Sequence, residues 1–246
     1  MLTADKIAWR DQFQKDGYVV LRGLVPDSCV QSAKDCIDSD IAHNFDPARQ
    51  VEYDNQSFCP DIRNSPEIMA LLKHPPVWKI LETTLGTEKF GHAVGQIAIR
   101  KAHNADREYD PEPHIDGIPT PHNGVPGTEI MNFSALIGVF LTEVNREFAG
   151  NFTVWPGSHL LLEQHFRQRG PQAIGEGMPR IELGNPLQLH CSPGDVVFCH
   201  YQLAHSVTVN LSSNDRYAVY FRIWLNDLGN QRWKRLTNIW DGWQAF

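Results

Sequence analysis

The spacing of hydrophobic residues changes after about residue 90 of this 246-residue chain. Before that point, apolar residues mostly recur every three or four positions, which is typical of helices that bury one face. Asp27 can cap such a helix, and the apolar residues that follow it keep the helical spacing: Val30, Ala33, Ile37 and Ile41. Ser65 and Pro66 form a second helix start, with serine as the cap and proline in the first helical position. This part of the chain predicts a helical support layer, interrupted by one strand at 18–25, YVVLRGLV.

From about residue 92 onward, short apolar runs alternate with turns rich in Gly, Pro and Asn. These runs predict strands at 92–101, 130–141, 151–155, 180–190, 195–200, 204–210 and 216–225. A single helix-like insert, 158–169, interrupts them. The number and spacing of the runs favour a sandwich or jelly roll, so the expected fold is mainly β with flanking helices. Without an internal repeat or a low-complexity linker, we expect one domain over residues 1–246.

Composition and charge narrow the choice of partners. The chain has 22 basic and 29 acidic residues, a net charge of −7, and no basic run longer than Arg100-Lys101, so we expect no nucleic-acid binding. Its most apolar run, 135–141, is far too short to span a bilayer, so we expect no membrane partner. The five cysteines include no Cys-x-x-Cys pair and are interpreted as reduced thiols. Together these features favour a cytoplasmic location.

Candidate chemistry begins in the segment PEPHIDGIPTPH at 111–122. On a strand, His114 and Asp116 would point to the same face, so both could bind one metal ion. Roughly one such His-x-acid triplet is expected by chance, so a third ligand is needed. His200 and His205 compete for that position, and His205 is favoured because it opens an alternating strand. Two histidines and one carboxylate leave three metal positions open, as in non-haem Fe(II) oxygenases.

Arg216, eleven residues after His205, indicates what else the site could bind besides a metal. A guanidinium group binds carboxylates bidentately, so an arginine beside such a metal site suggests a co-substrate that carries a carboxylate.

Four blocks in order carry a resemblance to a known family: FQKDGYVVLRGLVP at 13–26, His114-Ile115-Asp116, GNFTVWPGSH at 150–159, and PGDVVFCHYQLAH at 193–205. Asn210 and Arg216 also follow His205 at the family's spacing. The chain resembles the phytanoyl-CoA dioxygenase family of Fe(II)/2-oxoglutarate-dependent oxygenases. The resemblance implies a double-stranded β-helix, the cupin-like jelly roll. It also implies that His114, Asp116 and His205 are the iron ligands and catalytic residues, and that Arg216 holds the distal carboxylate of 2-oxoglutarate.

The resemblance further implies the reaction. Fe(II), 2-oxoglutarate and O2 would hydroxylate an unactivated C–H bond, with decarboxylation of 2-oxoglutarate to succinate and CO2. Gln96 and Thr153 are expected to contact the co-substrate, and Arg100 and His122 the substrate. The loop 117–129 is interpreted as a lid or a substrate-selecting rim. Arg222, which shares a strand face with Arg216, is expected to form a structural salt bridge.

One position departs from the family pattern. Many members have Ser or Thr two residues after the second histidine, where it helps to hold the distal carboxylate, but this chain has Val207. Ser206 lies on the wrong side of a regular strand to replace it. Loss of one hydrogen bond to a charged group costs about 1.5–3 kcal/mol. The sequence therefore leaves open either weak co-substrate binding or a rearranged pocket.

Other classes of function stay open at this point. A cupin-like enzyme that uses a divalent ion as a Lewis acid without O2 would need the same metal ligands, and a small-acid-binding module would need the same arginine. Related halogenases lack the metal-binding carboxylate, so Asp116 favours hydroxylation. The absence of a basic cluster argues against acyl-CoA and favours a small-molecule substrate. Trp233, Trp240 and Trp243 form either a packed tail or a dimer contact, so a monomer or a homodimer is expected.

Overall fold

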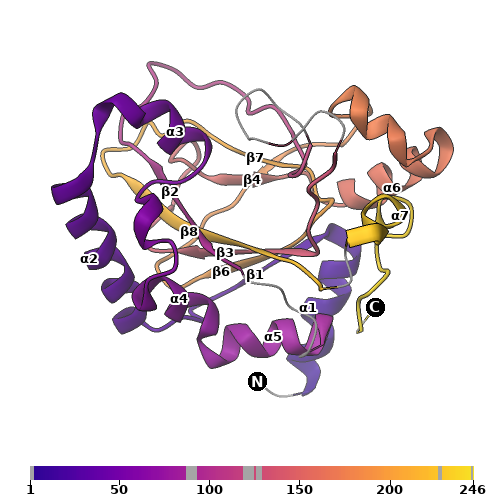
Figure 1. Ribbon diagram of the computed structural model, residues 1–246, viewed down its shortest axis with the longest axis horizontal. Coiled ribbons are helices and arrows are strands. Elements are labelled where there is room, and N and C mark those ends of the chain that lie inside the picture. Colours follow the sequence, from indigo (N-terminus) through magenta and orange to yellow (C-terminus); the bar gives the residue numbers. More distant parts are fainter. Residues whose placement is uncertain (1–2, 87–92, 119–124, 126–128, 227–228, 245) are drawn as a thin grey trace.

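The computed structural model describes residues 3–86, 93–118, 125, 129–226, 229–244 and 246. Its strands form two antiparallel sheets (Figure 1). The five-stranded sheet has the order β1 (Tyr18–Leu21), β6 (Val196–His200), β3 (Ala135–Phe140), β8 (Arg216–Ile223) and β2 (Gly95–Arg100). The three-stranded sheet has the order β5 (Leu187–Gln188), β4 (Phe152–Val154) and β7 (His205–Val207).

Helices cover the outer face of the five-stranded sheet, with α4 and α5 directly beneath it in Figure 1. The α-helices of the described chain are α1 (Thr3–Asp16), α2 (Asp27–Asn44), α3 (Gln50–Asn55), α4 (Pro66–Lys73), α5 (Pro75–Leu85), α6 (Ser158–Arg169) and α7 (Arg232–Arg235). Short 3-10 turns occur at Pro47–Arg49, Pro60–Ile62, Pro171–Glu176 and Gly229–Gln231. The expected fold class is confirmed, although more residues lie in helices than in strands.

Side-chain alternation along β8 divides the core into two layers. Its odd-numbered residues from Tyr217 to Ile223 pack with the helices, in a cluster that includes Phe13, Ile37 and Leu71. Ala218 and Tyr220 instead face the three-stranded sheet and pack with Phe152 and its neighbours. Because successive strand residues point to opposite faces, Arg216 and Arg222 also lie on this inner side. The space between the two sheets is therefore where the candidate residues meet.

Several predicted boundaries differ from the structure. Pro26 is the N-cap of α2, so Asp27 occupies the first helical turn, where its charge suits the helix dipole, and does not cap the helix. The Ser65 prediction is confirmed, because its side chain accepts a hydrogen bond from the Ile68 amide. The strand expected at 180–190 shrinks to β5, because Gly184 adopts φ +80° and Pro186 lacks an amide hydrogen.

The C-terminal aromatic residues pack back onto the helical layer. Trp240 and Trp243 lie 5.9 and 5.4 Å from the ring of Phe13 in α1, and Phe246 lies 5.3 Å from it. This confirms the interpretation of a packed tail for Trp240 and Trp243, whereas Trp233 packs on the cluster between the sheets. Within the described residues, none of the helices has the length and hydropathy needed to cross a membrane.

Candidate metal site

The first and third candidate ligands are joined through their backbones. His114 lies just outside regular sheet but forms a bridge with His205, the first residue of β7. Each amide donates to the other residue's carbonyl, at 3.0 Å from His114 and 2.9 Å from His205. The two imidazole rings lie 4.6 Å apart between centroids. This bridge brings two ligands that are distant in sequence to one edge of the small sheet.

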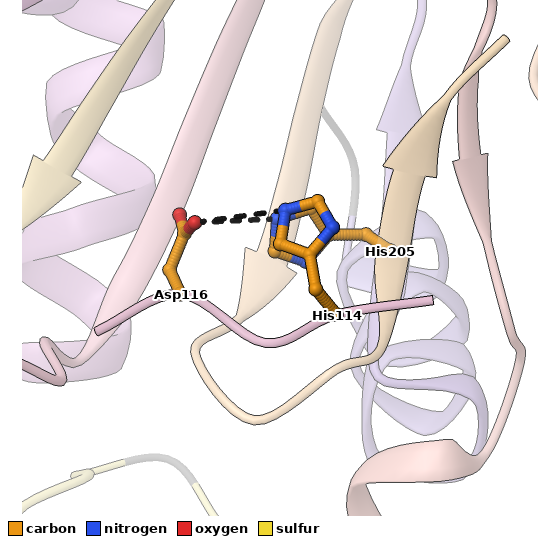
Figure 2. Close-up of side chains that lie close together, drawn as sticks. All are labelled: His114, Asp116 and His205. Carbon is orange, nitrogen blue, oxygen red and sulfur yellow. Dashed lines mark ion pairs between the residues drawn. The ribbon is translucent and has the colours of Figure 1, made fainter. Parts of the chain in front are cut away.

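Asp116 completes the cluster. Its Oδ1 atom lies 3.9 Å from Nε2 of His114 and 3.8 Å from Nε2 of His205, and all three side chains point toward one another (Figure 2). One ligand atom from each residue can be chosen such that all three lie within 4.8 Å of one another. The structure therefore brings together the three predicted ligands, and their two imidazole nitrogens and one carboxylate form the donor set of a two-histidine, one-carboxylate metal site.

Hydrogen bonding prepares His205 to bind a metal. Its Nδ1 atom lies 2.9 Å from the carbonyl of Leu203, so this nitrogen carries the proton and donates it. The lone pair of Nε2 is then available on the side that faces Asp116. A second-nitrogen hydrogen bond of this kind fixes both the tautomer and the ring orientation of a metal-binding histidine. His200, the competing candidate, bonds to the Ile239 carbonyl in the helical layer and lies outside the cluster.

Glycine at position 117 fixes the backbone just after the last ligand of this segment. Gly117 adopts φ +85°, and a side chain there would place its first carbon 2.5 Å from backbone atoms of Met131 and Asn132. The Met131 amide also donates to the Gly117 carbonyl. Only glycine tolerates this combination of left-handed conformation and close approach. Asp116 is thus held against the chain that leads into β3.

Arg222 binds the oxygen of Asp116 that faces away from the histidines. Its Nε and Nη2 atoms lie 3.0 and 2.8 Å from Oδ2 of Asp116. Its third nitrogen, Nη1, donates to Oε1 of Gln96 at 2.5 Å. The salt bridge expected for Arg222 is confirmed, and its partner is a candidate metal ligand.

This contact decides the charge of Asp116. Burial favours the neutral acid, but the guanidinium of Arg222 and the two nearby histidines outweigh it, so the pKa of Asp116 lies well below its ordinary value. The carboxyl group is therefore ionised near neutral pH and able to bind a cation.

The cluster opens on a cavity of about 360 Å³ between the two sheets. Gln96, Arg100, Arg216 and Arg222 line it, together with Tyr220 and Phe152. Residues 53–56 of α3 and its C-terminal end form another part of the wall. The sequence does not predict that α3 forms part of the cavity wall, because nothing in the spacing of its residues indicates this position. Sequence reasoning also missed Tyr220, which strand alternation with Arg216 would have found.

Arg216 lies at the opposite end of the β8 inner face from Arg222. It is 1% exposed, and its Nε and Nη1 atoms donate to the carbonyls of Gly150 and Ala98 at 2.9 and 3.0 Å. Arg100 is its direct partner in the register of β2 and β8. Among the described residues, neither arginine forms an ion pair with a carboxylate. This end of the cavity therefore offers positive charge to an anion.

Two further predicted site residues are Thr153 and His122. Thr153 does not line the cavity: its neighbour Phe152 does, while Thr153 pairs with Ser206 in the register and contacts the Asn151 carbonyl at 3.4 Å. Alternation therefore turns Thr153 to the other face of β4, contrary to the expected co-substrate contact. His122 lies outside the described residues, as does most of the expected lid at 117–129.

Comparisons with known proteins agree with this architecture. A family model for "Phytanoyl-CoA dioxygenase (PhyH)" matches residues 13–218, a range that includes the three clustered residues and Arg216. No curated protein matches the chain in sequence.

Solved structures share the fold at low sequence identity. SnoN, a non-haem α-ketoglutarate-dependent epimerase from nogalamycin biosynthesis, is 20% identical over 89% of this chain and 82% of its own, with a TM-score of 0.56. HygX from Streptomyces hygroscopicus, solved with nickel and 2-oxoglutarate bound, is 18% identical over 91% and 87%, with a TM-score of 0.57. SnoK, an α-ketoglutarate-dependent carbocyclase from nogalamycin biosynthesis, is 16% identical over 88% and 82%, with a TM-score of 0.59.

Proposed function

Because this chain belongs to the phytanoyl-CoA dioxygenase family, we propose that it is an Fe(II)- and 2-oxoglutarate-dependent oxygenase that acts on a small molecule. The observation that carries the proposal is the pairing of two features across one cavity. At one end, three ligand atoms lie within 4.8 Å of one another. At the other, Arg216 and Arg100 present guanidinium groups without a carboxylate partner among the residues described.

The residues present fit both groups. Two imidazole nitrogens and one carboxylate oxygen suit Fe(II) and leave open positions for further ligands. A dicarboxylate such as 2-oxoglutarate needs a cation at its distal end, and Arg216 lies buried on the same inner face as the metal ligands' partner Arg222. When bound, Fe(II) with 2-oxoglutarate and O2 supplies an oxidant able to attack an unactivated C–H bond.

The protein's own residues have distinct roles in this proposal. His114, Asp116 and His205 hold the metal, and Arg222 orients Asp116. Arg216 neutralises the distal carboxylate of 2-oxoglutarate and so fixes its direction in the cavity. The sheets and α3 form the walls of the remaining space. Gln96 and Arg100 line the cavity and are proposed contacts for the co-substrate and the substrate respectively.

Hydroxylation is the outcome we propose. Asp116 occupies the position that would have to be vacant for a halide ligand, so the residues present favour hydroxylation over halogenation. SnoN and SnoK, which share the fold, are an epimerase and a carbocyclase, so product analysis has to test this choice. The cavity volume of about 360 Å³ suits a small-molecule substrate.

Succinate formation tests the proposal. Purified protein is supplied with Fe(II), ascorbate, O2 and 2-oxoglutarate, and succinate is quantified with and without candidate substrates. We expect slow succinate formation that depends on O2 and is lost in Asp116→Ala. A protein that binds Fe(II) but neither binds nor decarboxylates 2-oxoglutarate would instead be a non-oxidative metal enzyme or a binding module.

A further inference from the structure

Position 207 lacks the hydroxyl group that helps to hold the distal carboxylate in many family members. Val207 is two residues after His205 on β7 and lines the cavity opposite Phe152, its partner in the register. Its side chain offers no hydrogen-bond donor. Ser206 also borders the cavity, but it pairs with Thr153 in the register, so strand alternation directs its side chain to the opposite face of the small sheet. The missing donor has to be sought on another strand.

Tyr220 of β8 reaches into the same space. It is four residues from Arg216 on the same inner face and packs against Phe152, with ring centroids 5.5 Å apart. Its ring lies across Gly138, its register partner on β3. A side chain at Gly138 would place its first carbon 2.7 Å from Cε1 of Tyr220, so the ring can lie there only because residue 138 is glycine.

The hydroxyl group of Tyr220 has no partner. It is buried, and it forms no hydrogen bond with any described residue. Burial raises the pKa of Tyr220 to about 12, against the opposite effect of the Arg216 guanidinium. The phenol is therefore protonated near neutral pH and can donate. A buried donor without an acceptor is unfavourable, and such an atom beside a binding site indicates a ligand group that is not part of the protein.

We propose that the Tyr220 hydroxyl replaces the missing Ser or Thr hydroxyl and, together with Arg216, binds the distal carboxylate of 2-oxoglutarate. This inference rests on the proposed function and adds to it a specific anchor on β8. The carboxylate accepts from the phenol and from the guanidinium at once, so Val207 leaves the anchor intact. The hydroxyl group that binds the carboxylate is thus supplied by β8 and not by β7. Gly138 on β3 leaves room for the ring of Tyr220.

Calorimetric titration under anaerobic conditions tests the proposal without catalysis. Fe(II)-loaded protein is titrated with 2-oxoglutarate and, separately, with 2-oxovalerate, which carries a methyl group in place of the distal carboxylate. Tyr220→Phe keeps the ring and removes only the hydroxyl group. We expect it to weaken 2-oxoglutarate binding about tenfold or more and to leave 2-oxovalerate binding unchanged. Ser206→Ala is the matched control and should bind both compounds like the wild type.

A rescue variant sharpens the test. Val207→Ser added to Tyr220→Phe restores a hydroxyl group at the usual family position and should recover most of the lost affinity for 2-oxoglutarate. Equal affinity of the wild type and Tyr220→Phe for 2-oxoglutarate would overturn the inference but leave the proposed function standing. An equal loss for both compounds would also overturn it, because the tyrosine would then act through packing alone. Absence of 2-oxoglutarate binding by the wild type would instead contradict the proposed function.

Discussion

Arg222 holds one oxygen of Asp116 while the other faces the two histidines. Two guanidinium nitrogens lie within 3.0 Å of Oδ2, whereas Oδ1 lies 3.8 and 3.9 Å from the histidine Nε2 atoms. The two oxygens of this carboxylate are therefore not equivalent. Oδ1 is the oxygen that would be available to a metal held by the two histidines.

Loss of the Arg222 contact should weaken metal binding. In Arg222→Gln, Oδ2 of Asp116 loses its ion pair and the carboxylate is free to rotate, so we expect the affinity for Mn(II), used as an O2-stable probe, to fall about tenfold or more. Calorimetry with the purified apo-protein measures this change. Arg222→Lys is the matched control, because it keeps the charge but loses the two-nitrogen contact. Its affinity for Mn(II) should lie between those of the wild type and Arg222→Gln. An affinity unaffected by Arg222→Gln would show that other contacts position Asp116.

Metal and 2-oxoglutarate should stabilise the folded chain through Asp116. At ligand concentrations about a hundredfold above Kd, bound ligand adds about 3 kcal/mol to the free energy of unfolding, or roughly 5 to 10 °C in Tm for a protein of this size. Thermal denaturation of the wild type, with and without both ligands, measures this shift. Asp116→Ala should lose it, whereas Asp54→Ala, which removes another carboxylate from the same cavity wall, should retain it. A full shift in Asp116→Ala would place the metal elsewhere.

Gly117→Ala should weaken metal binding, an effect that the strain of a left-handed backbone alone would not produce. Gly117 and Gly184 adopt similar left-handed conformations, φ +85° and +80°, but only Gly117 has backbone atoms within contact of an added carbon. We expect Gly184→Ala to lower the free energy of unfolding by about 1 kcal/mol and to leave metal affinity unchanged. Gly117→Ala should lose at least about tenfold in Mn(II) affinity, because Asp116 must move with the displaced backbone. Similar Mn(II) affinities in the two variants would argue against this account.

Acid should destabilise the protein through two buried histidines away from the metal site. Burial lowers the pKa of His159 to about 4 and that of His200 well below its ordinary value, so both stay neutral in the folded state. In the unfolded chain both histidines become protonated as the pH falls below about 6.5. The stability that the folded protein gains by comparison is therefore fully present above that pH and is lost as the pH falls toward 4. Between pH 7.5 and 5.5 we expect a loss of about 1 kcal/mol from each histidine.

Urea unfolding at the two pH values measures this loss. His159→Asn removes one of the two titrating groups, so the variant should be less sensitive to acid than the wild type, whatever its stability at pH 7.5. An identical pH dependence in the wild type and the variant would mean that His159 is already solvated in the folded protein.

The metal cluster is the part of the site that the sequence predicts best. The resemblance carried by the four sequence blocks predicts that His114, Asp116 and His205 lie together, although His114 and Asp116 lie outside the regular strands. Alternation also puts Arg216 and Arg222 on one face. The partner of Arg222 is not readable from the sequence, because Asp116 follows an isolated bridge, and the distance between them depends on how the two sheets stack.

Predictions that depend on strand pairing are less accurate. The sequence favours Thr153 because it precedes the Pro-Gly turn, but the register of β4 with β7 turns Phe152 inward and Thr153 outward. That register is a tertiary property, and a shift of one residue would exchange the two faces. Similarly, α3 joins the cavity wall only because the chain before β2 folds back over the sheets. The fold class is predictable from local patterns, whereas the cavity wall depends on the assembled layers.

The backbone bridge between His114 and His205 also sets the order in which the site can be made. During synthesis, His114 and Asp116 leave the ribosome well before β7, so a partly made chain carries two donors that cannot form a stable iron site alone. The third donor arrives only with the strand whose amide and carbonyl complete the bridge. A metal that needs all three donors would therefore bind only after the small sheet has paired.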